Sequence, residues 1–292
     1  MKVLAVGDCG VDRYVDIRAD RPGGISLNFA VNARQLFEPE DEIGVLTVLG
    51  NDSGAGVVEQ AIAEHGLGSS IAYGADSTPV QFIDRDETGE RIFVRYDAGA
   101  MAVHRLTVEE QTLMQRSDVV IAAIFNQVVD YFESVADAPA NALRALDYGN
   151  PGPPEDPLAY MRRYTERFDI GFVGLGPEQR HLLDQVEALA RDNKKIIVAT
   201  LGAEGSVTFS DGDPVWCSAV RVDNVVDTTG AGDTFAAGFL SVFAKGGTVA
   251  AAMERGARAA SRTVTHFGAF TAEFTPWPED YPAEWDLLRH KA

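Results

Sequence analysis

The chain has 292 residues, of which 46% are hydrophobic, and it carries a formal net charge of −19 at pH 7. Its length and composition fit a single large α/β domain, and no apolar run approaches the roughly 20 residues that would cross a membrane. The strong negative charge repels nucleic acid and anionic membranes, so we expect neither as a partner. The two cysteines, Cys9 and Cys217, lack metal-ligand spacing, which argues against a disulfide framework and is typical of a cytoplasmic protein.

Short apolar runs alternate with helical patterns along the chain. Strands are predicted at Val3–Val6, Gly44–Leu49, Val119–Ala123, Ala145–Tyr148, Ile170–Val173 and Ile196–Leu201. Helices are predicted between them at Leu27–Leu36, Gly56–Glu64, Val108–Gln115 and Gln179–Ala190. Strands that are apolar throughout are typical of parallel sheets with helices on both faces. In such sheets ligands bind beyond the carboxyl ends of the strands.

Some runs do not fit a buried parallel sheet, because they alternate polar and apolar residues. Arg13–Ile17 is one of them, and Val80–Asp84 and Arg91–Tyr96 form a hairpin pattern. We predict that residues of about 13–22 and 79–97 form a small β-flap, or lid. Gly205–Phe209 and Pro214–Cys217 are predicted to form a hairpin that ends the main sheet. Residues 271–292, rich in proline and aromatic residues, are expected to pack along the surface or at a subunit contact.

The stretch DTTGAGDTF, Asp227–Phe235, is the most informative in the chain. Val222–Val226 before it has strand character, and Phe235–Phe243 after it carries apolar residues at helical spacing. The stretch is therefore predicted to lie where a strand turns into a helix. The free backbone N–H groups and positive dipole end of a helix N-terminus favour an anion there. Glycines in that turn let a phosphate approach the backbone.

Asp233 in this stretch has two interpretations. It is either a first-turn acid that stabilises the helix dipole, or a base that takes the proton of an acceptor hydroxyl while nearby amides hold a phosphoryl group.

Two further glycine-rich stretches lie near predicted element ends. TLGAEGS, Thr200–Ser206, ends an apolar strand, and PGGISLNFAVNA, Pro22–Ala33, puts a glycine pair before a helix. Asn is unfavourable inside a helix, so the Asn28 side chain is expected either to act as a cap or to bind a ligand. Asp8 and Asp12 follow the first strand, where they are either turn residues or carboxylates that hold sugar hydroxyls.

Together these stretches resemble the ribokinase-like, phosphofructokinase B-type carbohydrate kinases. DTTGAGD is similar to the family's C-terminal signature, and the glycine pair followed by Asn28 is similar to its sugar-binding helix start. VLGNDSGAGVVEQAIAEHGL (Val48–Leu67) and TLGAEGS also match, in family order, over about residues 1–270. GDCGVDRYVD, RYDAGAMAVHRL and THFGAF most resemble the fructoselysine 6-kinase branch. The resemblance implies a ribokinase-like three-layer α/β/α sandwich, mostly parallel and with a lid, as a single domain over residues 1–292.

The resemblance also implies roles for the residues that match. Asp233 is the expected general base, and the expected anion hole consists of the amides of Gly230, Ala231, Gly232 and Asp233. The expected sugar ligands are Asp8, Asp12, Gly23, Gly24 and Asn28, with Arg95 of the lid as a candidate contact to an anionic group. The nucleotide side matches Thr200, Gly202, Gly205 and Gly232.

Metal ions are implied less directly. Asp227 and the carbonyl of Thr229 match a monovalent-cation (K⁺) site of many family members. Glu178 would hold Mg²⁺ through water, although Leu175 stands where the family's Asn-x-x-Glu segment has its Asn.

The expected activity is transfer of the γ-phosphate of ATP, with Mg²⁺, to a hydroxyl of an unphosphorylated sugar or fructosamine. No basic residue stands between Gly24 and Arg34, which disfavours a sugar phosphate. Alternatives are a ribokinase, fructokinase or 2-keto-3-deoxygluconate kinase type of enzyme, a nucleoside kinase, or a catalytically silent sugar sensor. A nucleoside kinase would stack its base on an aromatic residue such as Tyr14, Phe82 or Phe93. The resemblance also implies a homodimer through the lid.

Overall fold

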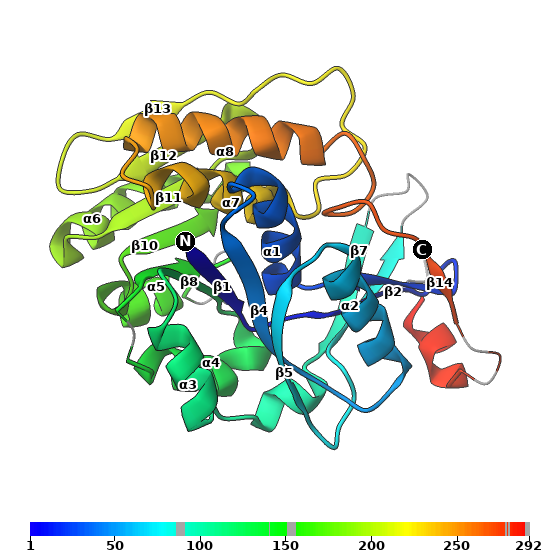
Figure 1. Cartoon of the computed structure of the whole chain (residues 1–292). Helices are drawn as coiled ribbons and strands as arrows, with labels where there is room; N and C mark the ends of the chain where they lie inside the picture. Colours follow the sequence, from blue (N-terminus) through cyan, green and yellow to red (C-terminus); the bar gives the residue numbers. More distant parts are fainter. Residues whose placement is uncertain (86–90, 140, 151–155, 278, 280, 290–292) are drawn as a thin grey trace.

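A long, mostly parallel sheet forms the centre of the molecule (Figure 1). The computed structural model describes residues 1–85, 91–139, 141–150, 156–277, 279 and 281–289. Within these residues the sheet has the order β13-β12-β11-β10-β9-β8-β1-β4-β5. Its parallel strands are β1 (Lys2–Val6), β4 (Glu42–Leu49), β5 (Gly68–Tyr73), β8 (Val119–Ala123), β9 (Leu143–Asp147), β10 (Ile170–Gly174) and β11 (Ile196–Thr200). The predicted hairpin, β12 (Ser206–Phe209) and β13 (Val215–Cys217), ends the sheet in antiparallel fashion.

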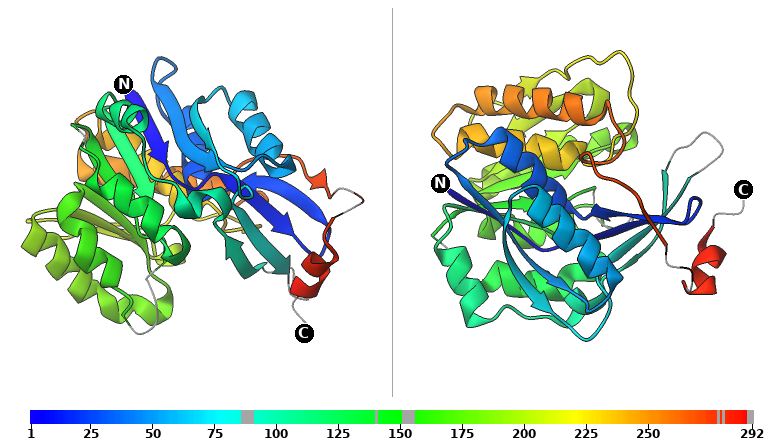
Figure 2. Two further views of the ribbon diagram at one scale, coloured as in Figure 1. Left: turned by 90° about the horizontal axis from the view of Figure 1, so that it is seen from below. Right: turned by 45° about the vertical axis from the view of Figure 1, so that its right-hand side comes forward.

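Helices cover both faces of this sheet. Successive side chains of each strand point to opposite faces, so strands that are apolar throughout present an apolar surface on each face. Val3 and Ala5 of β1 pack into one apolar cluster, whereas Leu4 and Val6 pack into another. The first cluster lies under α1 (Ile25–Leu36), α2 (Ser53–Glu64), α7 (Ala231–Phe243) and α8 (Val249–Thr263). The second lies under α3 (Val108–Gln115), α4 (Val129–Asp137), α5 (Ala159–Tyr164) and α6 (Leu183–Asn193) (Figure 2). The result is the expected three-layer sandwich.

A second sheet projects from the main body and forms the lid (Figures 1 and 2). Its order is β14-β3-β2-β6-β7, and the bounds are β2 (Gly10–Tyr14), β3 (Ala19–Gly23), β6 (Val80–Arg85), β7 (Arg91–Asp97) and β14 (Thr275–Pro276). β2 and β6 run parallel, with Asp12 opposite Gln81 and Arg13 opposite Phe82. The turn between β6 and β7 lies outside the described residues.

Short 3-10 segments complete the described chain at η1 (Gly99–Val103), η2 (Asn126–Val128), η3 (Thr165–Arg167), η4 (Pro177–Leu182), η5 (Gly202–Glu204) and η6 (Ala283–Leu288). The helix predicted at Gln179–Ala190 is divided between η4 and α6. Segment η6 belongs to the C-terminal tail, which packs against the lid rather than along the main body. No helix in the described part of the chain is long and apolar enough to cross a membrane.

The prediction of a strand at Val222–Val226 is wrong. This stretch is an extended loop in which Val225 is 55% and Val226 is 51% exposed. Its valines favour an extended backbone, but the backbone N–H of Val226 donates a hydrogen bond to the carbonyl of Val264 at the end of α8, not to a strand. Strand β5 and helices α4, α5 and α8 were not predicted. β5, with the sequence GSSIAY at a sheet edge, has too few apolar residues to give a strand pattern.

Candidate active site

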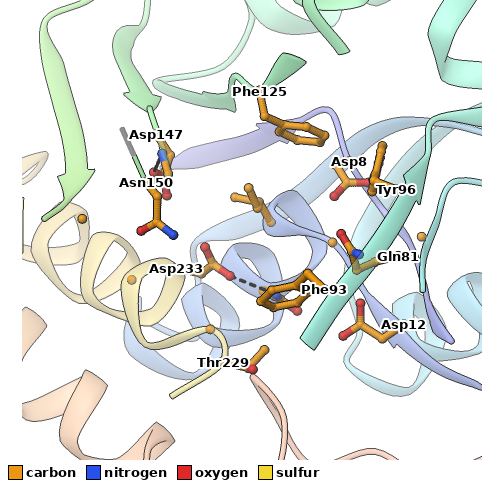
Figure 3. Close-up of a pocket in the computed structure, with 18 of the residues that line it drawn as sticks. Asp8, Asp12, Gln81, Phe93, Tyr96, Phe125, Asp147, Asn150, Thr229 and Asp233 are labelled. Atoms are coloured by element: carbon orange, nitrogen blue, oxygen red, sulfur yellow. Dashed lines mark hydrogen bonds between the residues drawn. The ribbon is translucent and has the colours of Figure 1, made fainter. Parts of the chain in front are cut away.

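A cavity of about 610 Å³ lies between the lid and the carboxyl ends of the main strands (Figure 3). Figure 3 shows Asp233, Asp147 and Asn150 of the main body on one side of it, and Asp12 and Gln81 of the lid on the other. Phe93 and Tyr96 of β7, Phe125, Asp8 and Thr229 also line the cavity and are labelled in Figure 3. Elements far apart in sequence therefore converge where ligands bind in open parallel sheets.

Asp233 lies in the first turn of α7 and is 9% exposed. Asn28 of α1 donates a hydrogen bond from Nδ2 to Asp233 Oδ2 at 2.9 Å. Burial raises the pKa of Asp233 well above its usual value, and the negative charge of Asp147 raises it further, whereas the bond from Asn28 lowers it. The site thus holds a buried carboxylate that binds a proton more tightly than a carboxylate in water does.

The start of α7 depends on two glycines with different constraints. Gly230 precedes the helix with a φ of 72°, and a Cβ there would lie 2.1 Å from the Cβ of Ala269. At Gly232, by contrast, a Cβ would meet no heavy atom within 4 Å apart from those of its own helical turn. The amides of Gly232 and Asp233 lie in the first turn, where a helix offers its N–H groups no acceptor of its own. This turn can therefore receive an anion close to the backbone.

Asp147 and Asn150 line the same cavity and were missed in the sequence. Asp147 ends β9, its Oδ1 accepts a 2.7 Å hydrogen bond from the amide of Gly149, and burial raises its pKa to about 6. The available signal was an acid at the carboxyl end of a predicted strand. None of the described residues that line this cavity is Lys or Arg.

The glycine pair packs closely against Asp8 and against Asp12, which lies in β2. Gly24 has a φ of 97°, and a Cβ there would lie 2.5 Å from the carbonyl oxygen of Asp8. Gly23 does not line the cavity, but a Cβ on it would lie 2.5 Å from the Asp12 carboxyl group. Tyr96 donates a 2.6 Å hydrogen bond to Asp8 Oδ1, and burial raises the pKa of Asp8. Asp8, Asp12, Gly24 and Asn28 all line the cavity, as expected from the sequence.

Arg95 is not among the residues that line the cavity, so the expected contact with substrate is not supported. A register shift in the β6–β7 pairing puts Phe93 and Tyr96 on the cavity side. The Arg95 guanidinium lies 4.4 Å from the centre of the Phe82 ring, and Phe82 does not line the cavity either. Of the three aromatic residues considered for a nucleoside base, only Phe93 reaches the cavity; Tyr14 and Phe82 are buried elsewhere.

A second cavity, of about 720 Å³, lies between η5, β12, α7 and α8. Thr200, Gly202 and Gly205 line it, as expected for the nucleotide side. Gly205 has a φ of 103°, and a Cβ there would lie 2.1 Å from the carbonyl oxygen of Cys217, so this turn requires glycine. Thr200, Thr228 and Gly232 line both cavities, which therefore meet at the N-terminus of α7.

Neither of the two candidate metal-binding carboxylates, Glu178 and Asp227, lines either cavity. Glu178 is exposed on η4 and lines neither cavity; a Cβ on Gly176 would lie 2.4 Å from its Oε1. Asp227 accepts hydrogen bonds from the amides of Thr229 at 3.0 Å and Gly268 at 2.7 Å. In the described part of the chain, no group of three or more His, Cys, Asp or Glu side chains is arranged to hold a metal ion.

The model of the pfkB family of carbohydrate kinases matches residues 14–275. The chain belongs to this family. It is 30% identical over 272 residues to a fructoselysine 6-kinase of Shigella flexneri, covering 92% of this chain and 100% of that protein. It is 28% identical over 280 residues to a fructosamine kinase of Bacillus subtilis, covering 92% of this chain and 93% of that protein. A ribokinase structure from Thermotoga maritima aligns with a TM-score of 0.74 at 20% identity, over 91% of this chain and 94% of that one.

These comparisons confirm the resemblance seen in the sequence. The pfkB kinase has the ribokinase-like fold, and its most informative relatives belong to the fructoselysine kinase branch. It is an ATP-dependent phosphotransferase that acts on a sugar hydroxyl.

Proposed function

We propose that this kinase phosphorylates a hydroxyl group of a fructosamine of the fructoselysine class, with Asp233 as the general base. The observation that carries the proposal is the junction of two cavities beside Asp233, with Gly232 lining both. A sugar in the first cavity and a nucleotide in the second would meet at the base and at the first turn of α7. In-line phosphoryl transfer requires this arrangement of acceptor, donor and base.

The proposed chemistry assigns a task to each group at the junction. Asn28 holds the Asp233 carboxylate in place, and burial makes that carboxylate more basic. As the sugar oxygen bonds to the γ-phosphorus and the bond from phosphorus to the β,γ-bridging oxygen breaks, the hydroxyl proton passes to Asp233. The amides of Gly232 and Asp233 stabilise the charge on the transferring group, whereas the amide of Ala231 donates a 3.2 Å hydrogen bond to the carbonyl of Thr228.

The second cavity fits a nucleotide, because its volume falls in the range of small-molecule sites and glycines line its phosphate end. Thr200, Gly202 and Gly205 would hold ATP there. The buried acids Asp147 and Asp233 have raised pKa values, and among the described residues no Lys or Arg lines the first cavity beside them, whereas Arg221 lines the second. A triphosphate that reaches the junction of the two cavities therefore needs a cation of its own. We propose that Mg²⁺ comes with ATP, neutralises this charge, and contacts Glu178 only through water.

The acidity of the first cavity supports the choice of substrate. Asp8, Asp12, Asp147 and Asp233 line it without a Lys or Arg among the described lining residues. Carboxylates attract the ammonium group of an amine adduct and repel a phosphate group. A fructosamine is therefore favoured over a sugar phosphate, in keeping with the names of the relatives in Shigella flexneri and Bacillus subtilis.

A nucleoside is the second candidate substrate, favoured by one observation. Phe93 lines the cavity from the lid and is 64% exposed, so a planar base could stack on it. A K⁺ site at Asp227 and the carbonyl of Thr229, and a homodimer through the lid, remain proposals that follow from the family.

The test is ADP release with Mg-ATP against fructoselysine, other fructosamines, fructose, ribose, 2-keto-3-deoxygluconate and nucleosides. We expect turnover on a fructosamine that Asp233→Asn abolishes. Turnover on a plain sugar or a nucleoside would reject the fructosamine while keeping the mechanism. Sugar binding without turnover on any compound would instead favour a silent sensor.

A further inference from the structure

The C-terminal tail forms an aromatic cluster on the face of the lid that points away from the cavity. β14 pairs with β3, and the ring centre of Trp285 lies 5.0 Å from that of Trp277 and 6.2 Å from that of Tyr281. Trp277 donates a 2.8 Å hydrogen bond from Nε1 to Asp20 of β3. Arg18 holds the Asp286 carboxylate with two hydrogen bonds, of 3.2 and 3.0 Å. The tail is therefore attached to the lid at several points.

Trp285 lies on the centre of the lid. The Arg13 guanidinium lies 3.7 Å from the centre of the Trp285 ring, and the Phe82 ring lies 6.1 Å from it in an edge-to-face arrangement. Arg13 also forms a buried two-bond ion pair with Asp20, at 2.9 and 2.7 Å. Desolvated cation–π contacts of this kind restrict the position of the strand that carries the cation.

The strands that Trp285 touches are the ones that carry cavity residues. Arg13 and Phe82 are paired across β2 and β6, and the preceding residues, Asp12 and Gln81, are paired in the same way. Because side chains alternate along a strand, the first pair meets the tail while the second pair lines the cavity.

We propose that Trp285 is a positioning residue for the sugar cavity. It packs against β2 and β6 on the face of the lid opposite to the cavity, and this brace fixes where Asp12 and Gln81 meet the substrate. The proposal concerns residues beyond position 275, where the match to the family model ends. It rests on the proposed placement of the sugar in the first cavity, but the brace itself does not depend on which sugar binds there.

The first experiment compares Trp285→Ala with Trp285→Phe and with Leu287→Ala, a matched control in the same segment whose side chain is 82% exposed. We expect Trp285→Ala to raise the KM for the sugar about tenfold while the KM for ATP stays unchanged. Trp285→Phe should restore most of the affinity, and Leu287→Ala should behave like the unchanged protein. An unchanged sugar KM in Trp285→Ala, or an equal rise in both KM values, would overturn the proposal.

A second measurement needs no substrate. Hydrogen–deuterium exchange of the Trp285→Ala protein should become faster in β2 and β6 and stay unchanged in α7. Exchange that rises equally throughout would indicate general destabilisation and reject a specific brace. Because exchange is measured without substrate, this readout tests the brace independently of the proposed function. The substrate panel tests the proposed function.

Discussion

Asn28 and Asp233 stand 205 positions apart in the sequence, yet the Asn28 amide donates a 2.9 Å hydrogen bond to the Asp233 carboxylate. Both side chains are buried, Asn28 in the first turn of α1 and Asp233 in the first turn of α7. The two helices pack side by side on one face of the main sheet. A residue expected to bind sugar thus also holds the expected base, and this contact changes what its substitution should do.

Replacing Asn28 with Ala should affect turnover as well as sugar binding. Loss of a hydrogen bond to a charged group should lower kcat roughly tenfold to a hundredfold and raise the KM for the sugar. The KM for ATP should stay unchanged, because Asn28 does not line the second cavity. Steady-state kinetics would check this, with Asn193→Ala, at the end of α6 and outside both cavities, as the control. Equal changes in both KM values would place Asn28 outside the sugar site.

Replacing Asp233 with Asn removes the proposed base while keeping its size. We expect kcat to fall by about 10²–10⁴-fold with the fold and sugar binding retained. Asp184→Asn, an exposed acid on α6, serves as the control. Thermal unfolding and calorimetric sugar titration would confirm that the variant is intact. A loss of less than tenfold would contradict the role as base.

Replacing Asp147 with Asn should move the pH dependence of the reaction. Burial and then the charge of Asp147 raise the pKa of Asp233, and the base acts only when it is ionised. Activity should therefore rise with pH through the pKa of Asp233, and removing the Asp147 charge should shift that rise to lower pH. The measurement is kcat/KM for the sugar against pH. A shift to higher pH, or none, would show that the two carboxyl groups do not interact.

Replacing Gly232 with Ala tests the anion hole without disturbing the fold. The new methyl group would meet no atom within 4 Å outside its own helical turn but would stand where both cavities meet. Stability should stay equal or rise by about 0.5–1 kcal/mol, because Ala is the better helix former, while kcat/KM for ATP should fall. Gly56→Ala, at a helical glycine in α2 with equally open surroundings, is the control. Unchanged kinetics would mean that the phosphate does not approach this backbone.

Replacing Phe93 with Ala tests which substrate the lid covers. A ligand that packs against this exposed ring should lose affinity, so the KM for the sugar should rise severalfold while the KM for ATP stays unchanged. Val103→Ala, at a residue that is 80% exposed and lines neither cavity, is the control. An unaltered sugar KM would show that the ring stays in solvent when the substrate is bound.

Local patterns predicted much of the scaffold. β1 and α3 were predicted because a buried strand is apolar throughout and because helical spacing repeats along one face. The failure at Val222–Val226 has a physical cause: the valines favour an extended backbone, but a strand also needs a neighbouring strand to pair with. The position of Arg95 outside the cavity lining could not be read from the sequence, because the register shift between β6 and β7 depends on how the two strands pair.

The sequence by itself determined the family, the glycine turns and the residue types that the chemistry needs, because these depend on short stretches with fixed backbone requirements. Gly24, Gly205 and Gly230 have positive φ values and no room for a side chain. Only the tertiary structure decided which acids share one cavity, that Asn28 holds Asp233, and that the tail packs against the lid. Those relationships join residues far apart in the chain, and their pKa shifts and contacts arise only when folding removes water and brings the charges together.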